Sequence, residues 1–214
     1  MRPNILKKNL LIAGWILLLL VSVYYILHNC LPFFVFTEAS YSRHFWPRAS
    51  WLFIHIVSGI VATLVIPFQL IPSIRKNYLS MHRSLGYTYL ISVTCSSVTS
   101  FYLAATSDFN IAYITGFTCF TFAWISTTLM GYIAIINRNI TQHREWMIRS
   151  YVVTLGFSTM RLLKDSLVPV DIATRPHLIT ALTWISWVIP LFITELVLRA
   201  RKVKGTNTLP ANNK

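Results

Sequence analysis

Two histidine–arginine pairs stand out in a chain with few charged side chains. His82 and Arg83 lie in the stretch IRKNYLSMHRSLGYTY, and His143 and Arg144 lie in NRNITQHREWMIRSY. An imidazole can ligate a metal or pass on a proton, and a guanidinium binds anionic groups. Each pair falls between two apolar runs. We therefore expect both pairs at the edges of hydrophobic segments, with the two imidazoles at one depth.

Further polar residues lie inside the apolar runs. His55 and Gln69 share one helical face. Arg161 shares a stripe with His143 if one helix carries both. A lone intramembrane His is most often an interhelical hydrogen-bonder, and a ligand or proton-relay role is the alternative. For Arg161 two partners remain open, Asp165 on the same helix or an anionic group near His55.

The composition is that of a membrane protein. Hydrophobic residues make up 55% of the 214 residues and charged residues only 12%, whereas soluble domains average about a quarter charged. The net charge of +13 does not indicate nucleic acid, because the basic residues lie between apolar runs and at the chain ends. Hydrolase, nucleotide-binding and cysteine metal motifs are lacking from the sequence, which disfavours those enzyme classes.

Six segments are long and apolar enough, or nearly so, for helices that cross a bilayer. They cover about 9–29, 50–73, 84–106, 110–136, 146–168 and 178–198. The first has no cleavage site and is expected to remain as a helix. The predicted fold is therefore an all-α polytopic transmembrane bundle of six helices, a single domain over 1–205 with a polar cytoplasmic tail over 206–214.

The distribution of basic residues predicts the orientation. Most Lys and Arg residues lie before the first segment, after the sixth, and in the connections that hold the two His-Arg pairs. The positive-inside rule then places both termini and both pairs at the cytoplasmic face. We expect a multi-pass protein of the cell membrane, the inner membrane in a bacterium, that contacts anionic lipid head groups at that face.

The chain resembles an uncharacterised bacterial family of predicted membrane proteins, domain of unknown function twenty-three-oh-six. The resemblance covers about residues 50 to 165, and HREWMIRSY is its most specific part. The other matching residues are His55, Gly59, Gln69, Arg75, His82, Arg83, Gly86 and Arg161. It implies a membrane protein and supports this choice of residues, but it implies no reaction. The architecture is also similar, more loosely, to two-haem transmembrane cytochromes of the ferric-reductase kind.

Three hypotheses for function follow. In the redox hypothesis, His82 and His143 bind haem iron or a quinone at the inner face, and His55 with Arg161 forms an outer site. The anionic groups of the cofactor are then held by Arg83, Arg144 and Arg149. In the transport hypothesis, a small anion or protons move along a polar path that is lined by His55, Gln69, Ser150 and Arg161. In the third, the protein is a non-catalytic component that binds anionic lipid. The candidate binding residues are His55, Gln69, His82, Arg83, His143, Arg144, Trp146, Arg149 and Arg161.

Overall fold

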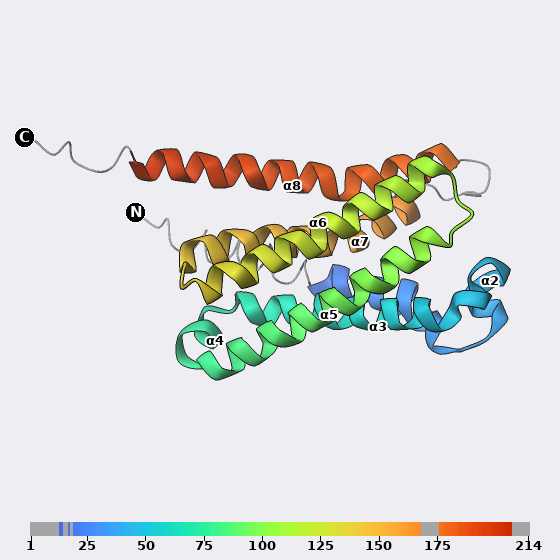
Figure 1. Cartoon of the computed structure of the whole chain (residues 1–214), viewed down its shortest axis with the longest axis horizontal. Helices are drawn as coiled ribbons and strands as arrows, with labels where there is room; N and C mark the ends of the chain where they lie inside the picture. Colours follow the sequence, from blue (N-terminus) through green and yellow to red (C-terminus); the bar gives the residue numbers. More distant parts are fainter. Residues whose placement is uncertain (1–12, 15–16, 18, 168–175, 207–214) are drawn as a thin grey trace, which may run out of the picture.

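The computed structural model describes residues 13–14, 17, 19–167 and 176–206, and within these ranges the fold is helical and has no strand. The long helices run side by side along the long axis of the molecule (Figure 1). They are α3 (Ala49–Leu70), α5 (Leu79–Ala105), α6 (Ile111–Ile136), α7 (Ile140–Leu167) and α8 (Pro176–Thr206). A helix therefore lies over each predicted segment from residue 50 onward.

Short elements close the two ends of the bundle. The helical N-terminal segment continues through η1 (Ile26–Cys30) and η2 (Leu31–Phe34) to α2 (Glu38–Phe45) and η3 (Trp46–Arg48). The short helix α4 (Pro72–Asn77) lies at the opposite end from α2 (Figure 1). Residues 9–12 of the first predicted segment, and the predicted tail beyond residue 206, lie outside the described residues.

The helices that carry the His-Arg pairs begin earlier than expected. The segment predicted over 84–106 begins at Leu79, and the one predicted over 146–168 begins at Ile140. Asn139 supports the second start, because its side-chain Oδ1 accepts a hydrogen bond from the Gln142 N–H at 3.0 Å. Both imidazoles therefore lie in the first turns of long helices instead of ahead of them.

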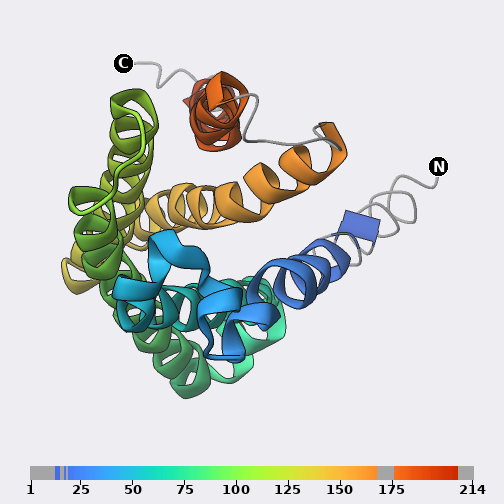
Figure 2. The same ribbon diagram turned by 90° about the vertical axis from the view of Figure 1, so that its right-hand side faces the viewer.

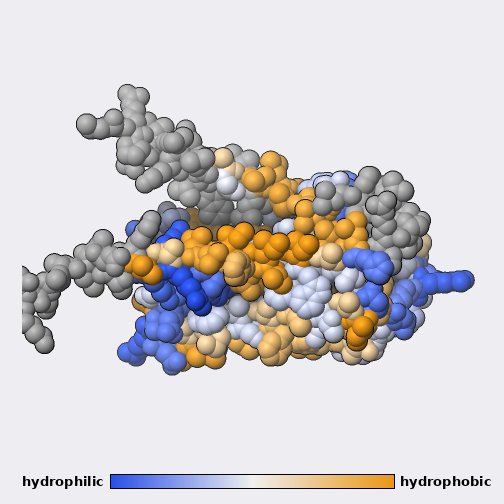
Figure 3. Space-filling model, turned by 90° about the horizontal axis from the view of Figure 1, so that it is seen from above, coloured by the Kyte–Doolittle hydropathy of each residue, from blue (hydrophilic) through white to orange (hydrophobic). Residues whose placement is uncertain are grey.

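Within the described residues, three stretches of helix are long and apolar enough to cross a membrane, namely Glu38–Leu70, Ile111–Ile136 and His177–Val203. Helices α5 and α7 have comparable length but carry many hydroxyl and charged side chains. The predicted six spans are therefore not confirmed, since these polar faces lower the hydropathy of the two helices. Seen from above, apolar surface fills the middle of the described molecule and hydrophilic surface gathers toward its ends (Figure 3).

The basic connections lie at one end of the molecule. The α4 segment, the α6–α7 turn and the C-terminal end of α8 share this end, and α2 and the α5–α6 connection share the other (Figure 1). We call them the basic end and the α2 end. The basic end thus carries the connections that the positive-inside rule assigns to one side of the membrane. Its cytoplasmic location remains a prediction.

A tight turn reverses the chain between α6 and α7. Arg138 has a φ of 57°, in the left-handed region. Its N–H donates to the Ile135 carbonyl at 3.0 Å, and the Asn139 N–H donates to the Ala134 carbonyl at 2.9 Å. This pair of bonds is a Schellman motif, in which the left-handed position usually holds glycine.

The main core lies among α3, α5, α6, α7 and α8. Fully buried members include Ile66, Tyr89, Val93, Trp124 and Val153. Viewed end-on, α8 lies on the opposite side of the bundle from α3 (Figure 2). The core thus surrounds the middle of α5 and α7.

Candidate functional site

The two histidines at the basic end lie within electrostatic range of each other. Burial lowers the pKa of His82, which precedes the predicted span over 84–106, and the charges of His143 and Arg75 lower it further. The Nδ1 atom of His143 lies 2.7 Å from the Gly131 carbonyl oxygen. Because a carbonyl only accepts, this nitrogen carries the proton and Nε2 is left as an acceptor. His82 Nδ1 is buried without a hydrogen-bond partner among the described residues.

Gln69 joins the end of α3 to the first turn of α5. It is 4% exposed, and its Nε2 donates to the His82 carbonyl at 3.0 Å. The amide also lies against Gly86, where a Cβ would be 3.5 Å from Nε2. Gln69 therefore holds the backbone of His82 in place, and it bonds that carbonyl instead of the imidazole.

A buried cluster of hydroxyl groups links α5, α6 and α7. The Tyr89 hydroxyl lies 2.7 Å from both Ser150 Oγ and Thr154 Oγ1. Thr128 Oγ1 lies 2.6 Å from Ser150 Oγ, and the Trp124 indole N–H donates to Thr154 Oγ1 at 2.8 Å. Each of these side chains is at most 2% exposed. We call these five residues the hydroxyl cluster.

The hydroxyl cluster has more short contacts than hydroxyl hydrogens. Its three contacts between hydroxyls are joined by two hydroxyl–carbonyl contacts, from Thr128 to the Trp124 oxygen and from Thr154 to the Ser150 oxygen. These five contacts share the four hydrogens of Tyr89, Thr128, Ser150 and Thr154. More than one arrangement of the hydrogens is therefore available, and the direction in which the hydroxyls donate along the cluster can reverse.

The hydroxyl cluster lies two helical turns from the histidine pair. Tyr89 follows His82 by seven residues, and Ser150 follows His143 by seven, a rise of about 10 Å. Met147 packs in this interval, since its Sδ would lie 2.7 Å from a Cβ placed on Gly131. The two groups are thus aligned but separated by a flexible apolar side chain.

His55 lies on the other side of the hydroxyl cluster, toward the α2 end. Its Nδ1 is 3.1 Å from the Ser96 carbonyl, 3.0 Å from Ser96 Oγ and 3.3 Å from Ser100 Oγ. The bond to the carbonyl requires a proton on Nδ1 and leaves Nε2 as an acceptor in the neutral ring. A cavity of about 30 Å³ separates His55 from Thr154 and Trp124, which is room for one water. Its lining residues are Tyr25, His55, Ile56, Gly59, Thr63, Ser96, Trp124, Thr154 and Phe157.

Arg161 lies within electrostatic range of His55. Its charge acts on His55, Tyr25 and Tyr113, which come from three other parts of the chain. The expected ion pair with Asp165 is not formed among the described residues, because the Asp165 side chain is exposed and makes no contact within ion-pair distance. The alternative, an anionic group near His55, remains a hypothesis.

Arg149 joins α7 to α8, and its guanidinium lies over the Trp146 ring. The Arg149 Nε and Nη2 atoms donate to Glu195 Oε2 of α8 at 3.0 and 2.6 Å. The guanidinium lies 4.7 Å above the Trp146 ring, and Lys202 of α8 pairs with Glu145 at 2.8 Å. The anion that Arg149 binds is therefore a carboxylate of the protein itself, in place of the anionic groups of a cofactor.

Arg83 and Arg144 are exposed to the surroundings of the protein. Both side chains are exposed and make no hydrogen bond or ion pair within the described part of the chain. They are available to groups outside the protein at the basic end.

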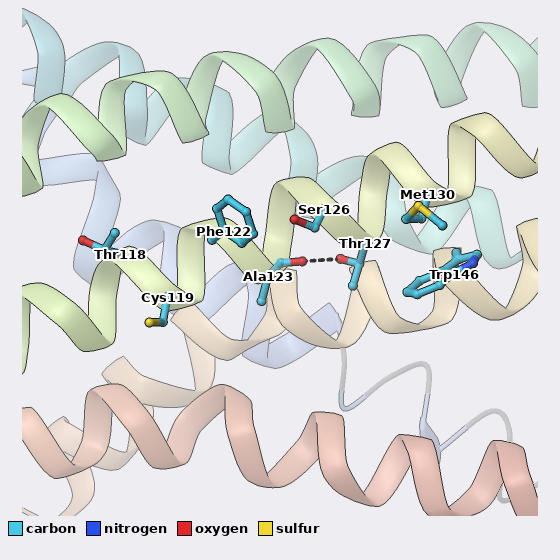
Figure 4. A pocket seen from close by; sticks show the side chains of 8 residues that line it. All are labelled: Thr118, Cys119, Phe122, Ala123, Ser126, Thr127, Met130 and Trp146. Carbon is cyan, nitrogen blue, oxygen red and sulfur yellow. Dashed lines mark hydrogen bonds between the residues drawn. The ribbon is translucent and has the colours of Figure 1, made fainter.

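An apolar groove of about 430 Å³ lies on α6 (Figure 4). Trp146 of α7 forms one end, beside Met130, and small side chains form much of the floor. Thr127 uses its hydroxyl on the Ala123 carbonyl at 2.7 Å, so it offers the groove little polarity. No candidate histidine lines this groove.

The hydroxyl cluster is the feature that sequence reasoning largely missed. The transport hypothesis includes Ser150, whereas Tyr89 and Trp124 lie inside the apolar segments predicted over 84–106 and 110–136. A usable signal exists on α5, where His82, Tyr89 and Ser96 recur at seven-residue intervals on one face. No group of three or more His, Cys, Asp or Glu residues in the described part of the chain is placed to hold a metal ion.

Comparison with known families agrees with the membrane composition. A family described as Predicted membrane protein (DUF2306) matches residues 52–198, which include every candidate residue named above. No curated protein and no solved structure matches the chain.

Proposed function

Because the chain belongs to the DUF2306 family of predicted membrane proteins, we propose that its bundle moves protons across a lipid bilayer. The proposed path runs from the His82–His143 pair through the hydroxyl cluster and the small cavity to His55. We call this set the polar file. In this arrangement the exposed Arg83 and Arg144 contact anionic lipid head groups at the basic end.

The hydroxyl cluster is the observation that carries the proposal. A proton moves along hydroxyl groups only if each oxygen can accept on one side and donate on the other. Five contacts that share four hydrogens supply this freedom. A cluster that served packing alone would need no such surplus of contacts.

The cavity and His55 extend the path toward the α2 end. A single water in the cavity of about 30 Å³ would bridge Thr154 to the imidazole. An imidazole with a free acceptor nitrogen can receive a proton there while its other N–H stays on a fixed partner. The small volume favours protons over a larger solute as the species that passes this point.

The interval at Met147 is the proposed point of control. The thioether is the flexible side chain between the histidine pair and Ser150. Its rotation away from Gly131 would admit water between these groups, and its return would close the file. Polar residues inside membrane segments commonly mark such proton pathways.

Proton flux into liposomes tests the proposal through Tyr89→Phe. The protein is reconstituted with a pH-sensitive dye inside, and a potassium diffusion potential drives protons inward. We expect Tyr89→Phe to remove one hydrogen bond and so to raise the free-energy barrier of the slowest step by about 1.4 kcal/mol, which slows the flux about tenfold. Thr88→Val is the matched control, because the Thr88 hydroxyl bonds only the Ser84 carbonyl of its own helix at 3.1 Å.

The expected result is proton flux above that of protein-free liposomes, retained by Thr88→Val and reduced by Tyr89→Phe. Elution from a sizing column before reconstitution checks that both variants are folded. Equal flux with and without the wild-type protein would sink the proposal. So would a Tyr89→Phe variant that conducts as well as the control.

Electron transfer through the histidine pair is the second candidate. The free Nε2 of His143 and the unpartnered, buried Nδ1 of His82 favour it, since a ligating imidazole usually has its other nitrogen held by a carbonyl or carboxylate. Haem is the cofactor tested first, by an absorption spectrum of the oxidised and dithionite-reduced protein. A Soret band that His82→Ala or His143→Ala removes would support it, and no band from cells supplied with haem precursors would exclude haem.

A further inference from the structure

The apolar groove on α6 lies outside the polar file, because none of its lining residues belongs to that set. It runs along α6 from Thr118 to Met130, where Trp146 of α7 forms its end (Figure 4). Its other lining residues are Cys119, Phe122, Ala123, Ser126 and Thr127. Phe122 is 65% exposed and Met130 is 41% exposed, and α6 is long and apolar enough to cross a membrane. In a bilayer the groove would therefore open to lipid hydrocarbon.

The dimensions of the groove suit one lipid chain. Met130 follows Thr118 by twelve residues, a rise of about 18 Å, and the hydrocarbon of one leaflet is about 15 Å thick. A helix from a second copy, about 10 Å wide with its side chains, would fill about 1,400 Å³ over that length. The groove has a volume of only about 430 Å³, so it suits a single hydrocarbon chain better than a helix.

An arginine in a strained conformation lies beyond the end of the groove. Asn137 follows Met130 by seven residues and Cys119 by eighteen, so it continues the face of α6 that holds the groove. Arg138 comes next, with its φ of 57°, and its exposed side chain makes no hydrogen bond or ion pair with the residues that the structure describes. Glycine would avoid the cost of this conformation. An arginine held there indicates that the guanidinium has a role outside the turn.

We infer that the groove binds one acyl chain of an anionic phospholipid whose phosphate is bound by Arg138. Beyond the hydrocarbon, the head-group layer of a leaflet is about 5–8 Å deep. Arg138 lies about 12 Å beyond Met130 along the helix axis, and its long side chain can reach back over part of that distance. A guanidinium binds a phosphate through two parallel N–H groups. Trp146, at the same end of the groove, is of the type that gathers at the edge of the hydrocarbon.

Lipid retained through purification tests the inference. The protein is extracted from membranes that contain phosphatidylglycerol, washed in neutral detergent and assayed for lipid phosphate per chain. Wild-type protein should retain a stoichiometric amount, and Arg138→Gln should retain less. Arg75→Gln is the matched control, because it removes the same charge from an exposed position on α4, at the basic end, and α4 packs against α3 and α5.

A titration of the delipidated protein measures the affinity for the anionic head group. The probe is phosphatidylglycerol with brominated chains, which quenches tryptophan fluorescence on contact. Arg138→Gln should raise the half-saturating mole fraction about fivefold, the effect of one basic residue beside an anionic lipid surface. The control Arg75→Gln should leave it unchanged, and phosphatidylcholine with the same chains should bind more weakly to the wild type.

Ser126→Trp tests the groove itself, because a large ring at this lining position would fill it. This variant should lose the retained phospholipid. Leu129→Trp should keep it, since Leu129 is 41% exposed on the same helix but does not line the groove. Elution from a sizing column checks the fold of each variant, and Arg138→Gln keeps the test decisive if Ser126→Trp does not fold.

The inference is overturned if folded Arg138→Gln or folded Ser126→Trp retains as much phosphatidylglycerol as its control. It is also overturned if Ser126→Trp turns a dimer into a monomer without changing the lipid content, because the groove would then be an interface between copies of the chain. Proton flux enters neither result, so this inference and the proposed function can fail separately.

Discussion

The ion pair between Arg149 and Glu195 should stabilise the packing of α8 against α7. The two charged hydrogen bonds, at 3.0 and 2.6 Å, would each be worth about 1.5–3 kcal/mol if fully protected from solvent. The Arg149 side chain is only 13% exposed, but that of Glu195 is 34% exposed. Because exposed pairs contribute about 1 kcal/mol or less, we expect a coupling energy of about 1–2 kcal/mol.

A double-mutant cycle with Arg149→Met and Glu195→Gln measures this coupling, with equilibrium unfolding in mixed micelles as the assay. The single change Arg149→Met should cost about 2–3 kcal/mol, because it also removes the stacking on Trp146. The cycle of Arg199→Met with Glu195→Gln is the matched control. Arg199 lies 3.0 Å from the same carboxylate but is 76% exposed, so its coupling should be about 0.3–0.5 kcal/mol.

The reasoning is refuted if the Arg149 cycle gives no larger coupling than the Arg199 cycle. That result would mean that the contact between α7 and α8 does not depend on this pair. Arg149 would then be free to bind a ligand, as the redox hypothesis supposed. A large coupling would instead explain why one arginine of the HREWMIRSY stretch faces another helix of the same chain.

Two further changes test the packing and the α6–α7 turn by unfolding in the same micelles. Gly116→Ala should cost about 1–2 kcal/mol net of the gain in helix propensity, because its Cβ would lie 2.6 Å from the Trp184 indole nitrogen. Gly59→Ala, whose nearest atom would be 3.9 Å away, should cost nothing, and equal losses would contradict the packing argument. Arg138→Gly should stabilise the protein by about 0.5–1 kcal/mol, since it relieves a left-handed residue. Asn137→Gly, at a φ of −77°, should give no such gain in stability. A lower stability of Arg138→Gly would show that the contacts of the arginine side chain outweigh the relief of its backbone conformation.

The membrane class followed from the sequence because it rests on composition, which needs no knowledge of contacts. Helices over the predicted segments from residue 50 onward followed for a similar reason, since long apolar runs must satisfy their backbone groups internally. The grouping of basic connections at one end also needed only the order of helices and loops along the chain. The early starts of α5 and α7 were missed, because a cap such as Asn139 extends a helix into polar sequence.

The partners of individual polar residues were decided only by the tertiary structure. Periodicity shows that His143 and Ser150 share a face, but it does not show which helix that face meets. The rotation and order of the packed helices determine that Ser150 meets Tyr89 and that Arg149 meets Glu195. They also determine that Arg161 meets no carboxylate among the residues that the structure describes. Arg149 and Arg161 are both arginines within one helix, yet the first is neutralised by α8 and the second is not. The difference arises because a charge finds its partner across a helix interface, and that interface is set by the packing of the whole bundle.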